Sequence, residues 1–166
     1  MTIHTSPLPE VEIPDVPLTE YILENAIALG DKPALIDGPS GRTITYAQLD
    51  DLVRRFAGGL IEHGLKPGDV VALMAPNIPE YAVVFHGAAL AGCAITTING
   101  TYTEREVHHQ LTDSGAVVLV TVEPFLDVAK AGVVDTDVRK IVVIGEEHAV
   151  RGGAGRWRMH ALAQGI

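Results

Sequence analysis

The sequence contains few cysteines, few basic residues and few aromatic residues, and each shortage excludes or disfavours a class of protein. One cysteine in 166 residues excludes a disulfide framework and any zinc finger that depends on several cysteines. The 12 Lys and Arg residues are scattered and are outnumbered by 21 Asp and Glu residues, so the net charge is −9. This balance argues against nucleic acid or an anionic membrane as a partner. The aromatic residues, 3 Phe, 4 Tyr and 1 Trp, are too few to favour a base-stacking platform.

Long uninterrupted apolar runs are also lacking. The stretch most similar to a membrane span is residues 78–98, but it contains Pro79, Glu80 and His86 and is broken at Gly92. A span needs about 20 predominantly apolar residues, so we interpret this stretch as a buried helix followed by a buried strand. The first ten residues hold neither a basic cluster nor an apolar run, which predicts no signal or transit peptide and favours a cytoplasmic location.

Apolar residues still make up 47% of the chain, enough to form the core of one domain. Residues 1–17 include four prolines and are expected to form an extended arm. From residue 18 the apolar spacing predicts a helix that Thr19 caps and Gly30 ends. The face predicted to be buried carries Leu18, Ile22, Ala26 and Leu29.

Turn residues then separate two short apolar segments. Residues 34–36 and 43–45 flank a turn composed of Asp, Gly, Pro and Ser, which predicts a β-hairpin. Thr45 with Gln48 has the spacing of a capping box at a helix start. In a capping box the N-cap side chain bonds to the backbone amide of the third helical residue, and the side chain of that residue bonds back to the N-cap amide. The helix that follows is expected to end at Gly64.

Two more helix starts are predicted further along the chain. Asn77 is placed to cap a helix with Pro79 in its first turn, ending near Gly92. Thr103 with Glu106 forms a second capping box. Shorter helices are predicted at residues 124–131 and around residues 157–163.

Four runs of strand length are rich in apolar residues, and residues 70–75 are apolar throughout rather than alternating with polar residues. Strands of this kind are covered on both faces, as in a parallel sheet. Because these runs alternate with the predicted helices, we predict an α/β fold: a doubly wound, mostly parallel sheet flanked by helices, with a short N-terminal β-hairpin. The predicted strands are residues 70–75, 93–97, 117–121 and 141–144.

Ligands of doubly wound sheets bind beyond the carboxyl ends of the strands, but no phosphate-binding motif occurs there. None of the four lysines follows a glycine, which excludes a P-loop. In the glycine-rich residues 152–155, the Gly-x-Gly that starts at residue 153 lacks the third glycine and the long helix of a dinucleotide site, so we interpret this segment as a turn. No cofactor-binding residue is predicted from the motifs.

Two pairs of side chains could carry chemistry, and both have a simpler interpretation. Cys93 and His86 could act as nucleophile and base, although a lone cysteine between small apolar residues is typical of a buried hydrophobe. His108 and His109 point about 100° apart on a helix, so they cannot hold one ion from one face. Glu104 shares a face with His108, but two ligands make a weak site. The patterns therefore predict no catalytic residue and no metal site.

The ordered sequence of capping boxes and strand ends resembles the adenylate-forming acyl- and aryl-CoA synthetases, most closely the 4-coumarate–CoA ligase-like members. The similarity covers about residues 18–166 and keeps the order and spacing of that family's N-terminal region. One departure is Gly100, where related sequences usually have proline. The segments that carry the resemblance are residues 45–49, 64–77, 79–81, 87–88 and 91–92, then Thr97, Asn99, Tyr102, Thr103 and Glu106, and residues 110–111 and 114–116.

The resemblance implies an α/β subdomain, residues 18–166, of a much longer AMP-binding ligase. Members of the family use ATP and magnesium to convert a carboxylic acid to an acyl-adenylate and then transfer the acyl group to coenzyme A. In such proteins the phosphate loop, the acyl pocket and the catalytic lysine lie beyond the position that corresponds to residue 166. We therefore expect this chain alone to be inactive, to hold none of these cofactors, and to have the remaining domains of the ligase as its partner.

Three residues are the candidates to face the ligand region, because they follow a strand at its carboxyl end: Asn99, Thr101 and Tyr102. The alternative is that they form only a turn and a helix cap.

Two further hypotheses remain open at this point. The chain could be a self-contained α/β binding or regulatory module of the flavodoxin type. If it is one part of a larger domain, its uncovered surfaces predict self-association. The acid substrate cannot be predicted from these residues.

Overall fold

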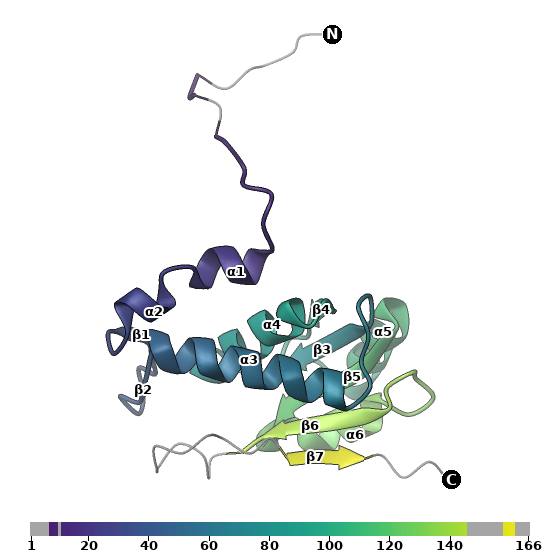
Figure 1. Cartoon of the computed structure of the whole chain (residues 1–166). Helices are drawn as coiled ribbons and strands as arrows, with labels where there is room; N and C mark the ends of the chain where they lie inside the picture. Colours follow the sequence, from purple (N-terminus) through teal and green to yellow (C-terminus); the bar gives the residue numbers. More distant parts are fainter. Residues whose placement is uncertain (1–6, 10, 146–157, 162–166) are drawn as a thin grey trace, which may run out of the picture.

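The computed structural model describes residues 7–9, 11–145 and 158–161 (Figure 1). Residues 11–17 contain no helix or strand and lead away from the body of the protein as an exposed arm. None of the helices within the described residues is both long enough and apolar enough to cross a membrane. The predicted glycine turn at residues 152–155 lies outside the described residues.

The first helical segment differs from the prediction. Residues 18–29 form two helices, α1 (Leu18–Leu23) and α2 (Ala26–Leu29), separated at Asn25, whose φ of −100° and ψ of 4° are not helical. The predicted cap at Thr19 was wrong, because Thr19 lies inside α1 with its side chain buried.

The predicted buried face of this segment was also largely wrong. Leu18 and Ile22 are 54% and 52% exposed, whereas Thr19, Leu23 and Ala26 are buried. The reason is tertiary: α1 packs on α4 (Pro79–Leu90) and α2 packs on α3 (Tyr46–Glu62), so each short helix turns a different face inward than one continuous helix would.

The β-hairpin forms as predicted, from β1 (Pro33–Ile36) and β2 (Thr43–Thr45), which pair antiparallel. The first capping box is confirmed: the amide of Gln48 donates to Thr45 Oγ1 at 3.3 Å, and the amide of Thr45 donates to Gln48 Oε1 at 3.0 Å. The predicted cap at Asn77 was wrong, since α4 begins after Ile78 with Pro79 as its first residue and without a side-chain cap.

The main sheet has the strand order β4-β3-β5-β6-β7, and the first four strands are parallel. Its strands are β3 (Val70–Met74), β4 (Ala94–Thr97), β5 (Ala116–Val122), β6 (Lys140–Ile144) and β7 (Arg158–Ala161). The predicted helix around residues 157–163 was wrong, because Arg158–Ala161 pairs antiparallel with β6. A segment this short gains little from helical hydrogen bonds alone, whereas pairing satisfies backbone groups at the free edge of β6.

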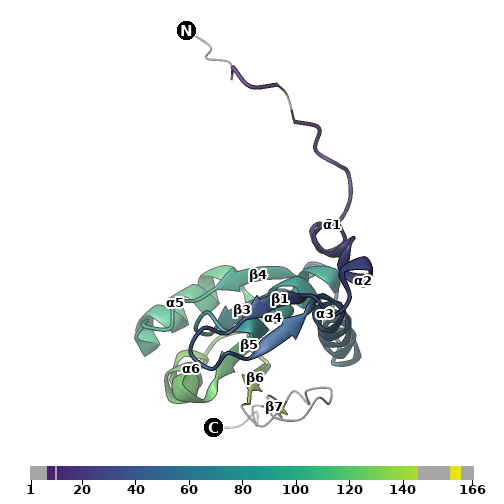
Figure 2. The ribbon, with the colours of Figure 1, turned by 90° about the vertical axis from the view of Figure 1, so that its left-hand side faces the viewer.

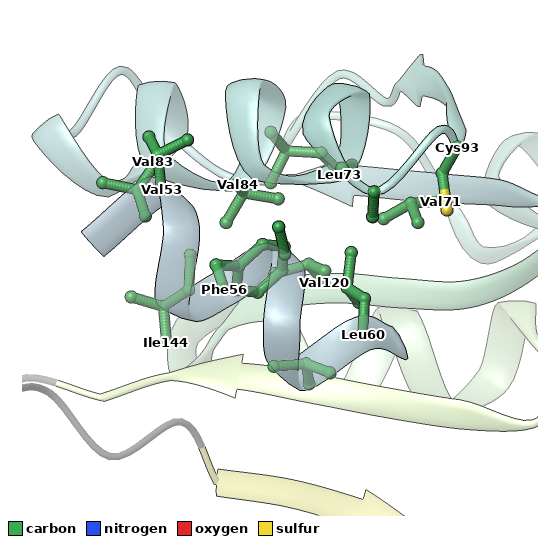
Figure 3. Close-up of a cluster of buried hydrophobic side chains, with 14 of the residues drawn as sticks. Val53, Phe56, Leu60, Val71, Leu73, Val83, Val84, Cys93, Val120 and Ile144 are labelled. Carbon is green, nitrogen blue, oxygen red and sulfur yellow. The ribbon is translucent and has the colours of Figure 1, made fainter. Parts of the chain in front are cut away.

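Helices cover both faces of the parallel strands, as the doubly wound prediction requires (Figures 1 and 2). On one face Val71 and Leu73 of β3 pack with side chains of α3 and α4, and Figure 3 shows this cluster around Phe56. On the other face Ala72 and Met74 pack with side chains of two further helices. These are α5 (Glu104–Ser114) and α6 (Leu126–Gly132), the latter preceded by the 3-10 turn η1 (Glu123–Phe125).

Close contact between α3 and α4 depends on Gly87. A Cβ at this position would lie 2.7 Å from Phe56 Cδ1 and 3.1 Å from the carbonyl oxygen of Val53. Gly58, in the middle of α3, has no such neighbour, because a Cβ there would meet nothing within 4 Å. The two glycines therefore differ in packing although both are helical.

We predict that Gly87→Ala lowers the free energy of unfolding by about 1–3 kcal/mol, because the added methyl group overpacks the contact with Phe56. Gly58→Ala is the matched control and should raise it by about 0.5–1 kcal/mol through helix propensity. Urea unfolding followed by circular dichroism measures both. Equal effects of the two substitutions would contradict the close α3–α4 contact.

Candidate ligand-facing edge of the sheet

The carboxyl ends of the parallel strands meet at one edge of the sheet. The chain leaves β3 toward α4 on one face, whereas it leaves β4 and β5 toward α5 and α6 on the opposite face. Neighbouring connections that diverge in this way leave room beyond the strand ends, which is where doubly wound sheets bind ligands. The segments at this edge are residues 75–77, 98–102, 123–125 and Gly145.

The loop after β4 contains the three candidate residues, and its geometry is set by Asn99. The Asn99 side-chain oxygen accepts hydrogen bonds from the amide of Thr101 at 3.0 Å and from its hydroxyl at 3.1 Å. The Asn99 carbonyl accepts from the amide of Tyr102 at 3.1 Å. This arrangement is an Asx turn, in which the asparagine side chain imitates a backbone turn.

The three candidates do not share one environment. Asn99 and Thr101 are exposed and bonded to each other, whereas Tyr102 is half-buried and packs against the apolar cluster beneath α5 and α6. The structure thus brings Asn99 and Thr101 together at the edge and directs Tyr102 toward the core. Because the Asn99 oxygen is occupied by the turn, its amide NH₂ group is the part available to a ligand. A ligand-facing role for these residues remains a prediction.

Phe125 is a residue of this edge that sequence reasoning missed. A Cβ on Gly100 would lie 2.6 Å from Phe125 Cε2 and 2.7 Å from its Cζ, so the ring occupies the space that a side chain at position 100 would need. The ring comes from η1, directly after β5, and joins the clusters on both faces of the sheet. Nothing in the local sequence signals this contact, because the two residues are brought together only by the strand order.

Gln110 of α5 is hydrogen-bonded to the end of β4. Its side-chain amide donates to Thr96 Oγ1 at 2.8 Å and to the Thr97 carbonyl at 2.9 Å. At the start of α5, Glu106 accepts from the Thr103 amide and hydroxyl, both at 2.8 Å, and these bonds lower the pKa of the Glu106 carboxyl. The Asn99–Tyr102 loop is therefore held firmly at both ends.

A buried hydroxyl joins the two central strands close to the same edge. Thr121 of β5 is fully buried and donates to the Met74 carbonyl at the end of β3, at 2.9 Å. Since an unpaired hydroxyl in the core is costly, this bond both satisfies Thr121 and aligns the ends of β3 and β5.

Cys93 and His86 lie in different environments with different partners. Cys93 is buried in the cluster of Figure 3, with its Sγ 3.9 Å from the carbonyl oxygen of Lys66, and burial raises the pKa of the thiol. A raised pKa disfavours the nucleophilic thiolate, which supports the interpretation as a buried hydrophobe. His86 instead interacts with Thr19, where Oγ1 and Nδ1 are 3.4 Å apart.

His108 and His109 lie on α5, half-buried and exposed respectively. Among the residues that the structure describes, no three His, Cys, Asp or Glu side chains come close enough together to hold a metal ion.

The model of one protein family, described as AMP-binding enzyme, matches residues 23–157. The chain belongs to this family. The match decides between the two hypotheses raised by the sequence, in favour of the adenylate-forming acyl-CoA ligases over a flavodoxin-like module.

Known ligases are similar to this chain in sequence and in structure. 4-Coumarate–CoA ligase 1 of Narcissus pseudonarcissus is 41% identical over 121 residues, covering 72% of this chain and 22% of the relative. A fatty acyl-CoA synthetase of Mycobacterium tuberculosis is 29% identical with a TM-score of 0.68, covering 76% of this chain and 26% of that protein. A long-chain-fatty-acid–CoA ligase of Archaeoglobus fulgidus has a TM-score of 0.78 at 23% identity, covering 88% and 31%, and shows the common fold.

The chain spans about a quarter of the length of the curated relatives that it matches, and it corresponds to their N-terminal part. The sequence-based identification of the family, and of this chain as an N-terminal portion of it, is therefore confirmed.

We predict that Gly100→Ala displaces the Phe125 ring from the loop after β4 and lowers the free energy of unfolding by about 1–2 kcal/mol. Gly145→Ala, after β6 at the same edge, is the control, because a Cβ there meets nothing within 4 Å. NMR shifts of the Phe125 ring protons report the displacement, and thermal unfolding reports the stability. Unchanged ring shifts in Gly100→Ala would contradict the contact.

Proposed function

We propose that this chain is the N-terminal α/β part of an ATP-dependent acyl- or aryl-CoA ligase. The proposed overall reaction joins a carboxylic acid to coenzyme A, with ATP converted to AMP and pyrophosphate through an acyl-adenylate. The observation that carries the proposal is the family match over residues 23–157, together with a fold shared with acyl-CoA ligases. ATP, magnesium and coenzyme A are the cofactors proposed for the whole enzyme.

Within that enzyme, we propose that this chain has a structural role and supplies no catalytic group. In the described residues no lysine directly follows a glycine, as the lysine of a P-loop does, and no cluster of acidic residues could hold magnesium. The role we propose for the Asn99–Tyr102 loop is to border the ligand region from one side. Its rigidity supports this role, since Asn99, Gln110 and Phe125 fix the loop without help from a ligand.

A domain exchange tests this proposal. Residues 18–145 replace the corresponding N-terminal segment of a 4-coumarate–CoA ligase, and the purified chimera is assayed for ATP–pyrophosphate exchange and for CoA-ester formation. We expect activity with an aryl or acyl acid, because the exchanged part has the same fold and the remainder carries the chemistry. The 166-residue chain alone should show no pyrophosphate exchange.

Two controls make the outcome decisive. The remainder of the ligase without any N-terminal part should be inactive, which shows that the exchanged segment is required. A chimera that is folded and monodisperse by circular dichroism and gel filtration yet inactive would contradict the proposal. Pyrophosphate exchange by the isolated chain would contradict its supporting role.

Self-association of the isolated chain is a second proposal. A groove between β1 and the start of α4 has a mainly apolar lining, formed by Leu35, Ile36, Ile78, Pro79, Ala82 and Phe85. Ile36 is 66% exposed beside it, and exposed apolar patches commonly mark association sites. The proposed occupant in the whole enzyme is another part of the ligase.

We predict dimers or larger species of the isolated chain in light scattering at high concentration. Ile36→Lys should reduce their proportion, because a charge at the groove opposes its burial. Val134→Lys is the matched control, since Val134 is similarly exposed, 59%, in the segment that follows α6. A wild-type chain that stays monomeric at every concentration would contradict self-association.

The proposed location is the cytoplasm. The thiol of Cys93 is buried and unpaired with another cysteine, which suits a reducing compartment.

A further inference from the structure

The exposed large apolar side chains of the described residues are concentrated near the N-terminus. In the arm, residues 11–17, Val11 and Ile13 are 84% and 86% exposed and Val16 is 49% exposed. From β3 onward, Val134 is the comparable side chain in the part of the chain that the structure describes. Scattered exposed apolar residues are normal, but a concentration of them marks a contact surface. The arm therefore offers an apolar surface to another part of a molecule.

The order of residues in the arm fits a polyproline II helix with one acidic side. Such a helix has three residues per turn, so residues three apart share a side. Glu12 and Asp15 then form one side, and the other two sides are apolar. The apolar residues are Val11 with Pro14 and Pro17 on one side, and Ile13 with Val16 on the other. Residues 14–17 also have the Pro-x-x-Pro spacing with which extended peptides bind grooves lined by aromatic rings.

The prolines hold the arm extended. Proline fixes φ, and a residue that precedes proline is restricted to extended backbone. Of residues 13–17, only Asp15 escapes both restrictions. Pro17 has φ −58° and ψ 139°, and its carbonyl accepts a hydrogen bond from the Tyr21 amide at 3.0 Å, so the start of α1 fixes the direction in which the arm leaves. An arm that is extended beforehand loses little conformational entropy when it binds.

The groove between β1 and α4 has the chemistry that such an arm needs. Its volume is about 400 Å³, and its mainly apolar lining includes two aromatic residues one helical turn apart on α4, Tyr81 and Phe85. Asn77 adds a polar side chain to the lining. Arg42 of the hairpin and Glu80 of α4 tie the two walls together through two contacts, at 2.6 Å and 2.7 Å. The groove is therefore formed before anything binds in it.

One end of the groove lies beside the point where the arm begins. His86 is the lining residue furthest along α4, and its carbonyl accepts from the Thr19 hydroxyl at 3.1 Å. Thr19 is the second residue of α1, so the arm starts directly before it. The other end of the groove lies near Ile36, since the Arg42–Glu80 ion pair holds the hairpin against the first turn of α4.

The lengths of the arm and the groove agree. The part of the lining that follows α4 runs from residue 78 to residue 86, which is about 12 Å at 1.5 Å per residue. As polyproline II the arm covers about 22 Å, so it is long enough to span the groove. An arm that enters at the His86 end brings Val11 and Ile13 toward the Ile36 end. Its two apolar sides then face the lining, and its acidic side faces water.

The groove of the same chain is difficult for this arm to reach. Figures 1 and 2 show the arm leading away from the body of the protein at the start of α1. Bending it back requires a reversal within residues 13–17, which the prolines oppose. A second copy removes this conflict. When the starts of two α1 helices meet, each arm enters the groove of the other chain at its His86 end.

We propose that two copies of this chain exchange arms, with residues 11–17 of each copy bound in the β1–α4 groove of the other. The exchange supplies the contact for the self-association proposed above, and it rests on that proposal. The dimer is closed, because two arms fill two identical grooves and leave none open. The two contacts form together, so their effects combine although each is small.

Sedimentation equilibrium of the whole 166-residue chain tests the exchange. We expect a dimer that dissociates on dilution. Ile13→Asp should raise its dissociation constant about tenfold or more, because each dimer then buries two carboxylates against apolar side chains. Val134→Asp is the matched control and should change the constant by less than about twofold, since it adds the same charge at an exposed position outside the groove. Because neither residue is buried, both variants should fold like the wild-type chain, which circular dichroism checks.

A disulfide cross-link identifies the chain that supplies the arm. Chains with Ile13→Cys and chains with Ile36→Cys are mixed and oxidised, and the linked peptides are identified by mass spectrometry. The natural Cys93 is buried and is kept. We expect a link between positions 13 and 36 of different chains, several-fold more abundant than the link formed when Val134→Cys replaces Ile36→Cys. A chain that carries both substitutions should also form this link between chains rather than within one.

The exchange and the self-association can fail separately. If the wild-type chain dimerises and Ile13→Asp dimerises equally well, self-association stands and the exchange is wrong. A link that forms mainly within one chain also overturns the exchange, because the arm then occupies its own groove. So does a link no more abundant than that of the Val134→Cys mixture. A wild-type chain that stays monomeric at every concentration overturns both.

Discussion

The burial of residues 71–74 of β3 is the constraint on which the rest of the structure depends. Val71, Ala72, Leu73 and Met74 are all 0% exposed, and β3 is paired on both sides, with β4 and β5. A strand in this position has no face or edge available to water, so every neighbour must supply apolar cover or a backbone partner. Alternate side chains of β3 accordingly define the two helical layers.

The geometry of the carboxyl edge is a consequence of this central strand. Because β4 and β5 both run parallel to β3, the loop that follows β4 and the η1 turn that follows β5 lie at the same end of the sheet. Phe125 bridges the two by occupying the space left open by Gly100. Contacts within the chain therefore hold this edge of the sheet in place.

The N-terminal segment has the opposite character. Its helix α1 contributes one apolar and one polar buried side chain, and the polar one depends on a histidine 67 residues further along the chain. Of the six residues of α1, only Thr19 and Leu23 are buried, so this helix contributes far less to the core than β3 does.

Much of the fold could be predicted from the sequence because its signals are local. The continuous apolar runs identify buried parallel strands, and Thr45 with Gln48 marks a helix start, since a capping box involves only neighbouring residues. Family membership was likewise predicted from the order and spacing of such segments. Asn99 and Thr101 were placed at the correct edge of the sheet, although their role there is a matter for experiment.

Only the tertiary structure decided the features that depend on distant parts of the chain. Thr19 was expected to cap a helix, but the contact with His86 on α4 buries it. Arg158–Ala161 was expected to be helical, but the free edge of β6 makes it a strand. Phe125 gave no local signal, because its partner Gly100 is adjacent only through the strand order. A hydrogen bond within one turn joins residues that are close in the sequence, so the local sequence predicts it. Packing between elements joins distant residues and is decided only when the chain has folded.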